Sequence, residues 1–143
     1  MPLPDFTFPR PLAALARRLP EWPVAQMFVT ALNLAERAGK LTGDWSSLDG
    51  RTVRIEIEDL GAGLSFTRGG NRFVAVSGEP TVCFRARAAD YLRIALREED
   101  PDTLFFQRRL KIEGNTELGL ELKNRLDALP LPDFLIRLRD RIA

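Results

Sequence analysis

The chain has 143 residues, enough for one domain that buries roughly two thirds of its unfolded surface. Its 21 Lys and Arg residues against 20 Asp and Glu residues leave a formal net charge of +1, so it lacks the broad positive field of nucleic-acid-binding proteins, and nucleic acid is not an expected partner. With no histidine and a single cysteine, Cys83, the sequence excludes an internal disulfide, His-based general-base catalysis and metal sites of the His or Cys type.

The first 39 residues are predicted to form an arm followed by two helices. Four prolines before residue 12 favour an extended arm that is ordered only by docking. Apolar residues then recur at helical spacing from Leu12 to Leu19, and Pro20 ends that helix. A second helix, from about Pro23 to Ala38, is apolar over more than half of its circumference. It must therefore be buried on more than one side or contact something apolar.

The middle of the chain is predicted to form a meandering sheet. Apolar and polar residues alternate over 53–57, 64–66, 72–76 and 82–86, which is the pattern of half-buried strands. Gly69-Gly70-Asn71 supplies the residues that a hairpin turn favours. A helix over about 88–97, a break at Asp100-Pro101, a strand over 109–113 and a longer helix follow, and 133–142 forms a last amphipathic segment. This order of elements predicts an α+β fold with one mixed sheet.

Residues 100–124, DPDTLFFQRRLKIEGNTELGLELKN, carry the most specific pattern. The run from Arg109 to Asn115, RLKIEGN, resembles the Gly-Arg-Leu-Lys-Ile-Glu-Gly-Asp-like strand of sterol carrier protein-type lipid-transfer domains. The preceding run from Asp100 is similar to the UbiT (YhbT) branch of that family. Arg108 favours that branch, because the broad family usually has a small residue there.

The resemblance implies a sterol carrier protein-like fold, in which one mixed sheet of about five strands is covered by helices that leave an apolar lipid tunnel. It also implies a division of the chain within one folding unit. Residues 1–39 would form the arm and first helices, 40–130 the lipid-binding domain, and 131–143 a C-terminal amphipathic helix.

Ten apolar residues are predicted to line a lipid cavity, because the helices carry more apolar surface than one small sheet can cover. They are Val53, Ile55, Ile57, Leu64, Phe66 and Phe84 in the sheet, and Phe105, Phe106, Leu118 and Leu122 in the roof. Phe105 and Phe106 are adjacent and cannot both face the same direction, so one is expected in the core and the other at the pocket or its mouth.

The last segment is predicted to contact anionic membranes. Phe134, Leu135 and Leu138 lie on its apolar side, and Arg137 and Arg141 lie on the rest of the helix. Packing against the domain explains the same pattern, so both interpretations stay open.

Two other features have a functional and a structural interpretation. Arg108 and Arg109 suit an acidic lipid headgroup or phosphate, but the pattern favours a solvated sheet edge or ion pairs with the acidic residues at 98–102. Cys83 lies in an alternating strand, where a small buried residue serves packing.

No set of residues for acid–base or covalent catalysis is present, so we expect a protein that is not an enzyme and that needs no cofactor. The resemblance implies an accessory factor of oxygen-independent ubiquinone biosynthesis, which binds prenylated quinone precursors and presents them to hydroxylases. Its implied partners are the UbiU and UbiV proteins, which carry iron–sulfur clusters that a chain with one cysteine cannot hold. The alternatives are a general phospholipid or fatty-acyl carrier and a scaffold subunit without a pocket.

The expected location is the cytoplasm, with transient contact at the inner-membrane surface. The N-terminus lacks the basic start and apolar run of a signal peptide, and no stretch reaches the roughly 18 apolar residues that cross a bilayer.

Overall fold

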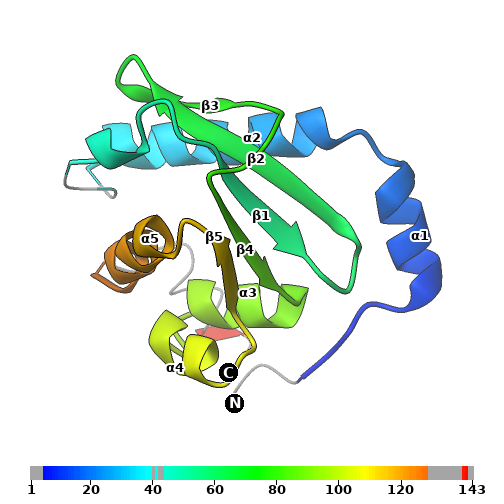
Figure 1. Cartoon of the computed structure of the whole chain (residues 1–143). Helices are drawn as coiled ribbons and strands as arrows, with labels where there is room; N and C mark the ends of the chain where they lie inside the picture. The colour runs from blue at the N-terminus through cyan, green and yellow to red at the C-terminus, as the bar shows by residue number, and fades with distance from the viewer. Residues whose placement is uncertain (1–4, 40, 42–43, 129–139, 142–143) are drawn as a thin grey trace.

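A computed structural model of the chain describes residues 5–39, 41, 44–128 and 140–141, and Figure 1 shows one sheet with helices grouped around it. The helices are α1 (Arg10–Arg18), α2 (Glu21–Arg37), the 3-10 turn η1 (Ser46–Leu48), α3 (Ala88–Ala95), α4 (Pro101–Phe106) and α5 (Thr116–Ala128). The strands are β1 (Val53–Ile57), β2 (Ala62–Gly69), β3 (Arg72–Ala75), β4 (Val82–Ala86) and β5 (Lys111–Gly114).

The five strands form one mixed sheet in the order β3-β2-β1-β4-β5. The central strand β1 is antiparallel to β2 and parallel to β4, whereas β2–β3 and β4–β5 are antiparallel pairs. Ile55 in β1 lies opposite Leu64 on one side and Phe84 on the other. The predicted α+β fold with one mixed sheet is therefore confirmed.

The alternation along the strands gives the sheet two unlike faces. The apolar residues Val53, Ile55 and Ile57 point to the face that α2, α3 and α5 cover, which is the side of the core. Arg54 and Glu56, the residues between them, point to the opposite face and form an ion pair of 2.8 Å. The register of β1 with its neighbours extends both faces across the sheet.

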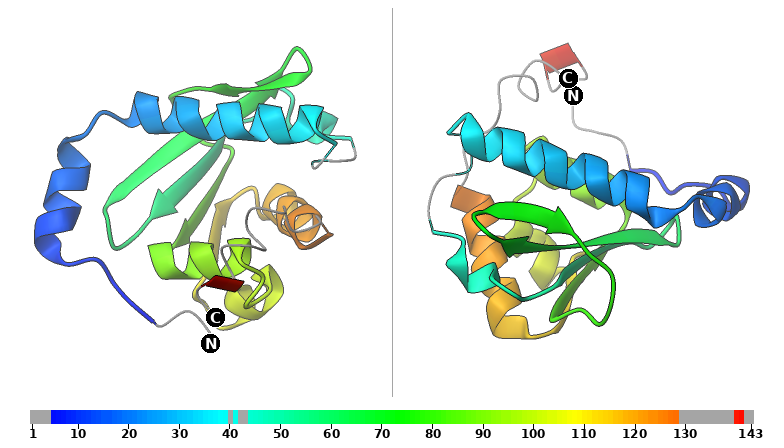
Figure 2. Two further views of the ribbon diagram at one scale, coloured as in Figure 1. Left: turned by 180° about the vertical axis from the view of Figure 1, so that it is seen from behind. Right: turned by 90° about the horizontal axis from the view of Figure 1, so that it is seen from above.

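Helix α2 protects the β3 edge of the sheet, along which it runs in both views of Figure 2. The side-chain amide of Asn33 replaces a missing strand, because it donates to the Phe73 carbonyl at 2.9 Å and accepts from the Phe73 N–H at 2.8 Å. An edge strand with free backbone groups would otherwise invite pairing with another chain. The same helix brings the ring of Phe28 to 5.5 Å from that of Phe66.

The described part of the N-terminal arm, from Asp5 onward, docks on α3, in agreement with the expectation that docking orders it. The Asp5 carboxylate lies 2.7 Å from Arg87 Nη2 and 3.2 Å from Arg93 Nη2. The Phe8 N–H donates to Asp59 at 3.0 Å, and the other oxygen of Asp59 accepts from the first N–H of α3. One turn between β1 and β2 thus ties the arm to the start of α3.

The segment expected to be a break at Asp100-Pro101 begins a short helix instead. The Asp100 carboxylate accepts from the Thr103 N–H at 2.7 Å, which makes it the N-cap of α4, and Pro101 occupies the first turn, where no N–H is needed. Because Arg108 then turns into the left-handed region (φ 61°), β5 begins at Lys111, two residues later than predicted.

The Gly-Asn pair after β5 has a clear structural role. Gly114 has a φ of 86° and lies so close to the Thr81 carbonyl that an added Cβ would be 2.6 Å from the oxygen. Asn115 accepts from the Leu118 N–H at 3.0 Å and so caps α5. The motif therefore turns the chain from the sheet edge into the helix that covers it.

Candidate functional site

An apolar cavity of about 460 Å³ lies between the sheet and the helices. Its volume falls within the range of small-molecule binding pockets. The sheet side is lined by Val53, Ile55, Ile57, Leu64, Phe66, Phe73 and Phe84. The helices and connections contribute Phe28, Leu32, Leu41, Trp45, Leu48, Tyr91, Ile94, Ala95, Pro101, Leu110, Leu122 and Lys123.

Seven of the ten residues predicted to line a cavity come together at this one. The six sheet residues are all there, because strand periodicity assigns their face, and Leu122 of α5 joins them. Phe105, Phe106 and Leu118 are not among the lining residues, so the predicted roof is corrected. The sequence did not single out the contributions of Trp45, Tyr91 and Lys123. The broad apolar circumference of α2 did indicate that this helix contacts apolar material, and Phe28 and Leu32 of α2 line the cavity.

The roof differs from the prediction because α4 directs Leu104, and not Phe106, toward the core. Leu104 is the residue of this helix that enters the core, and Phe106 is left 80% exposed. Phe105 is half-buried, with the Lys123 ammonium 5.7 Å from its ring centroid. Leu118 is buried in the core without lining the cavity.

Three of the lining residues carry a polar side-chain group. The Tyr91 hydroxyl lies 2.9 Å from the Glu56 carbonyl and 3.1 Å from the Phe84 carbonyl, so backbone oxygens accept its hydrogen. Burial raises the pKa of Tyr91 well above its ordinary value, which keeps the phenol neutral. Lys123 forms an ion pair with Asp102, and the indole N–H of Trp45 is buried and has no hydrogen-bond partner within the described residues.

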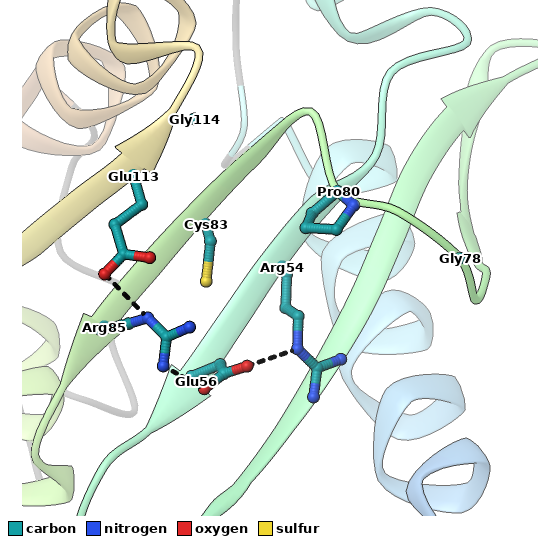
Figure 3. A pocket seen from close by; sticks show the side chains of 8 residues that line it. All are labelled: Arg54, Glu56, Gly78, Pro80, Cys83, Arg85, Glu113 and Gly114. Carbon is teal, nitrogen blue, oxygen red and sulfur yellow. Dashed lines mark hydrogen bonds and ion pairs between the residues drawn. The ribbon is translucent and has the colours of Figure 1, made fainter.

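A second hollow, of about 430 Å³, lies on the opposite face of the sheet and is polar (Figure 3). Its charges are already paired: Glu56 lies 2.8 Å from both Arg54 and Arg85, and Arg85 also approaches Glu113 at 3.1 Å. Cys83 sits among these residues, and burial raises its thiol pKa above the ordinary value. A protonated thiol beside neutralised charges is a poor nucleophile, which favours the packing interpretation of Cys83.

The two arginines that precede β5 have different surroundings. Arg109 pairs with the buried carboxylate of Asp90 and lies 3.3 Å from Glu99, whereas Arg108 is exposed. The ion-pair interpretation therefore holds for Arg109.

Most of the predicted membrane-contact residues, Phe134, Leu135, Arg137 and Leu138, lie outside the described residues. Arg141 lies within them and is exposed. In the described part of the chain, no helix combines the length and the apolar character needed to cross a membrane.

Comparison with known proteins points to one family. The model of the SCP-2 sterol transfer family matches residues 31–127. The ubiquinone biosynthesis accessory factor UbiT of Escherichia coli K12 is 39% identical over 127 residues, which cover 88% of this chain and 68% of that protein. The UbiT protein of Escherichia coli O157:H7 matches at the same identity and coverage.

Two solved structures share the fold. One is described as the UbiJ-SCP2 ubiquinone synthesis protein; it aligns with a TM-score of 0.55 at 18% identity and covers 76% of this chain and 97% of that chain. The other is palmitated SCP2L2 from Aedes aegypti, with a TM-score of 0.52 at 14% identity, covering 68% of this chain and 89% of that chain. At such low identities these likenesses concern the fold alone.

Proposed function

The chain belongs to the UbiT group of the SCP-2 sterol transfer family, and on that premise we propose that it is a non-catalytic accessory factor of ubiquinone biosynthesis that carries a lipid. The apolar cavity would hold the tail of a prenylated quinone precursor, and the carrier would present the ring to separate hydroxylases in the oxygen-independent route. The observation that carries the proposal is the cavity of about 460 Å³ on the covered face of the sheet.

The size of the cavity limits how the ligand fits. A volume of this order encloses a drug-sized molecule. A longer isoprenoid tail would extend through the mouth, or would require the helices to move apart. A general phospholipid or fatty-acyl carrier is therefore the second candidate, since one acyl chain suits the same space. The pocketless scaffold has less support, because a cavity is present.

Lipid extraction and mass spectrometry of the protein, purified from cells grown without oxygen, test the proposal. A matched pair of variants links any lipid to the cavity. Ile55→Trp adds bulk at the centre of the lining, whereas Leu120→Trp makes a comparable change at an exposed position outside it. We expect prenylated precursors with the wild type and Leu120→Trp, and little lipid with Ile55→Trp. Phospholipid or fatty acid alone would favour the second candidate, and no lipid in any sample would reject both.

We also propose that the carrier loads at a membrane surface. Helix α1 exposes Leu12 and Leu15, and Leu19, which directly follows the helix, is also exposed. The helix contains three arginines and has no acidic residue, as an interfacial helix does. Cosedimentation with anionic vesicles should fall in Leu15→Asp and stay unchanged in Leu120→Asp. For the C-terminal segment, with Phe134, Leu135, Arg137, Leu138 and Arg141, truncation before Asp133 is the corresponding test; equal sedimentation would assign that segment to packing.

The implied partners, UbiU and UbiV, stay part of the proposal. Copurification of tagged wild-type protein with these two proteins, in parallel with Ile55→Trp, would show whether association depends on a filled cavity.

A further inference from the structure

The apolar cavity is closed at one end and open along one side, as the burial of its lining residues indicates. The residues around η1, β3 and α5 are buried: Trp45, Leu48, Phe73 and Leu122. The residues that α2, α3 and the connection after α2 contribute are half-buried: Phe28, Leu32, Leu41, Tyr91, Ile94 and Ala95. In the left view of Figure 2, β1 is visible between α2 and α3, and α5 lies near the C-terminal end of α2. The mouth therefore lies between α2 and α3, and the closed end lies at Trp45.

The indole ring of Trp45 forms the wall at the closed end, and its contacts hold it there. The Phe73 ring meets it at 71° with a centroid distance of 5.9 Å, and the Arg125 guanidinium carbon lies 4.9 Å from its centroid. The Trp45 carbonyl accepts from the Leu48 N–H at 3.0 Å, which fixes the backbone at the start of η1. Because the Arg125 side chain is partly exposed, the ring separates the cavity from a charged group at the surface.

The interior of the cavity offers no place for the polar head of a ligand. Nearly all of the surface that the described residues present to the cavity is apolar. The Tyr91 hydroxyl donates to backbone oxygens, and the Lys123 ammonium is paired with Asp102. A polar head buried among apolar side chains loses its hydrogen bonds to water and gains none. An amphiphile therefore enters tail first and leaves its head at the mouth, in contact with water.

We propose that the Trp45 ring is the stop that determines how long an apolar tail the cavity encloses. This inference rests on the proposed lipid-carrier function and deepens it, since it names the residue that sets the length specificity of the site. The ligand class is an amphiphile with one apolar tail, whose last carbon atoms contact the indole ring. When the tail is longer than the distance from the mouth to Trp45, the surplus lies outside the mouth, between α2 and α3.

The first test measures the affinity of saturated fatty acids of increasing length, from octanoate to eicosanoate, by displacement of a fluorescent fatty acid. For the wild type, we expect the affinity to rise roughly four-fold with each enclosed methylene and to level off once the terminal methyl group reaches Trp45. Trp45→Leu should leave the affinity of the short chains unchanged and move the plateau to longer chains. Trp22→Leu, the matched control at a residue that is 72% exposed, should reproduce the wild-type series.

A smaller substitution guards against loss of the fold. Trp45→Phe keeps an aromatic ring beside Phe73 and should move the plateau in the same direction by fewer carbon atoms, with circular dichroism to check that the variant is folded. A plateau at the wild-type length in the folded variants would overturn the inference. Equal losses of affinity at every length would also overturn it, because the ring would then only support the fold. Failure of the wild type to bind any of the chains would instead reject the carrier function on which the inference rests.

A second measurement needs no substitution at the site. The chain has two tryptophans, so Trp22→Phe leaves Trp45 as the only source of indole fluorescence. Because a bromine atom quenches this fluorescence on contact, hexadecanoate brominated at its terminal carbon is compared with hexadecanoate brominated beside its carboxylate, at equal occupancy. We expect strong quenching by the terminal bromine and little by the other. Equal quenching by both probes, or stronger quenching by the bromine beside the carboxylate, would overturn the inference.

Discussion

Replacing Phe106 with Asp should leave both the fold and the bound lipid in place, although the residue lies in the most family-specific segment of the sequence. Phe106 is 80% exposed, so only about 40 Å² of a ring that can bury about 200 Å² is covered. At about 25 cal/mol per Å², its removal costs about 1 kcal/mol. The new carboxylate stays in water and carries no desolvation penalty.

Phe84 is the contrasting position, because it is 7% exposed and lines the cavity. Phe84→Ala should cost about 3–5 kcal/mol through lost burial and an enlarged cavity. With a melting shift of about 4 °C per kcal/mol for a chain of this length, we expect a fall of about 4 °C for Phe106→Asp and at least about 12 °C for Phe84→Ala.

Thermal unfolding followed by circular dichroism measures the stability difference, and mass spectrometry of extracted lipid measures occupancy. A folded Phe106→Asp protein that has lost its lipid would place Phe106 on the ligand's path. A melting temperature lowered as far as that of Phe84→Ala would show that the ring is buried. Either result would refute the arrangement of α4 described above.

Three further substitutions test the local geometry. Arg108→Gly should raise the free energy of unfolding by about 0.5–1 kcal/mol in denaturant titration, because Arg108 has a left-handed φ of 61°. The control Gln107→Gly, at an ordinary φ of −81°, should lower the free energy of unfolding. Cys83→Ser should keep lipid binding and quinone synthesis, and loss of synthesis in a folded variant would point to thiol chemistry. Because burial raises the pKa of the Cys83 thiol, the stability that this residue contributes to the wild type should be complete below pH 9.0 and fall as the pH rises beyond it. Asp5→Ala should speed hydrogen exchange in the arm, and equal exchange in both proteins would show that the ion pair does not hold the arm. Because hydrogen bonding to Arg87 lowers the Asp5 pKa, the wild-type arm should stay protected at neutral pH and lose protection only as the pH falls below 3.8.

The sequence by itself determined the strands, their faces and the family. Val53, Ile55 and Ile57 could be assigned to one face because the side-chain period of a strand is two and needs no knowledge of neighbours. The Gly114-Asn115 turn was equally predictable, since a left-handed residue followed by a helix cap is local chemistry.

Only the tertiary structure decided which aromatic residues outside the sheet meet the cavity. Phe106 and Trp45 show why. Phe106 belongs to a helix of six residues, where a rotation of about 100°, the angle between neighbouring residues, exchanges core for solvent. Trp45 lies in an irregular segment that has no period. The depth of the cavity depends on how far α2, α3 and α5 stand from the sheet. That spacing comes from contacts between residues distant in sequence, such as Asn33 with Phe73 and Arg125 with Trp45, and no local pattern encodes it.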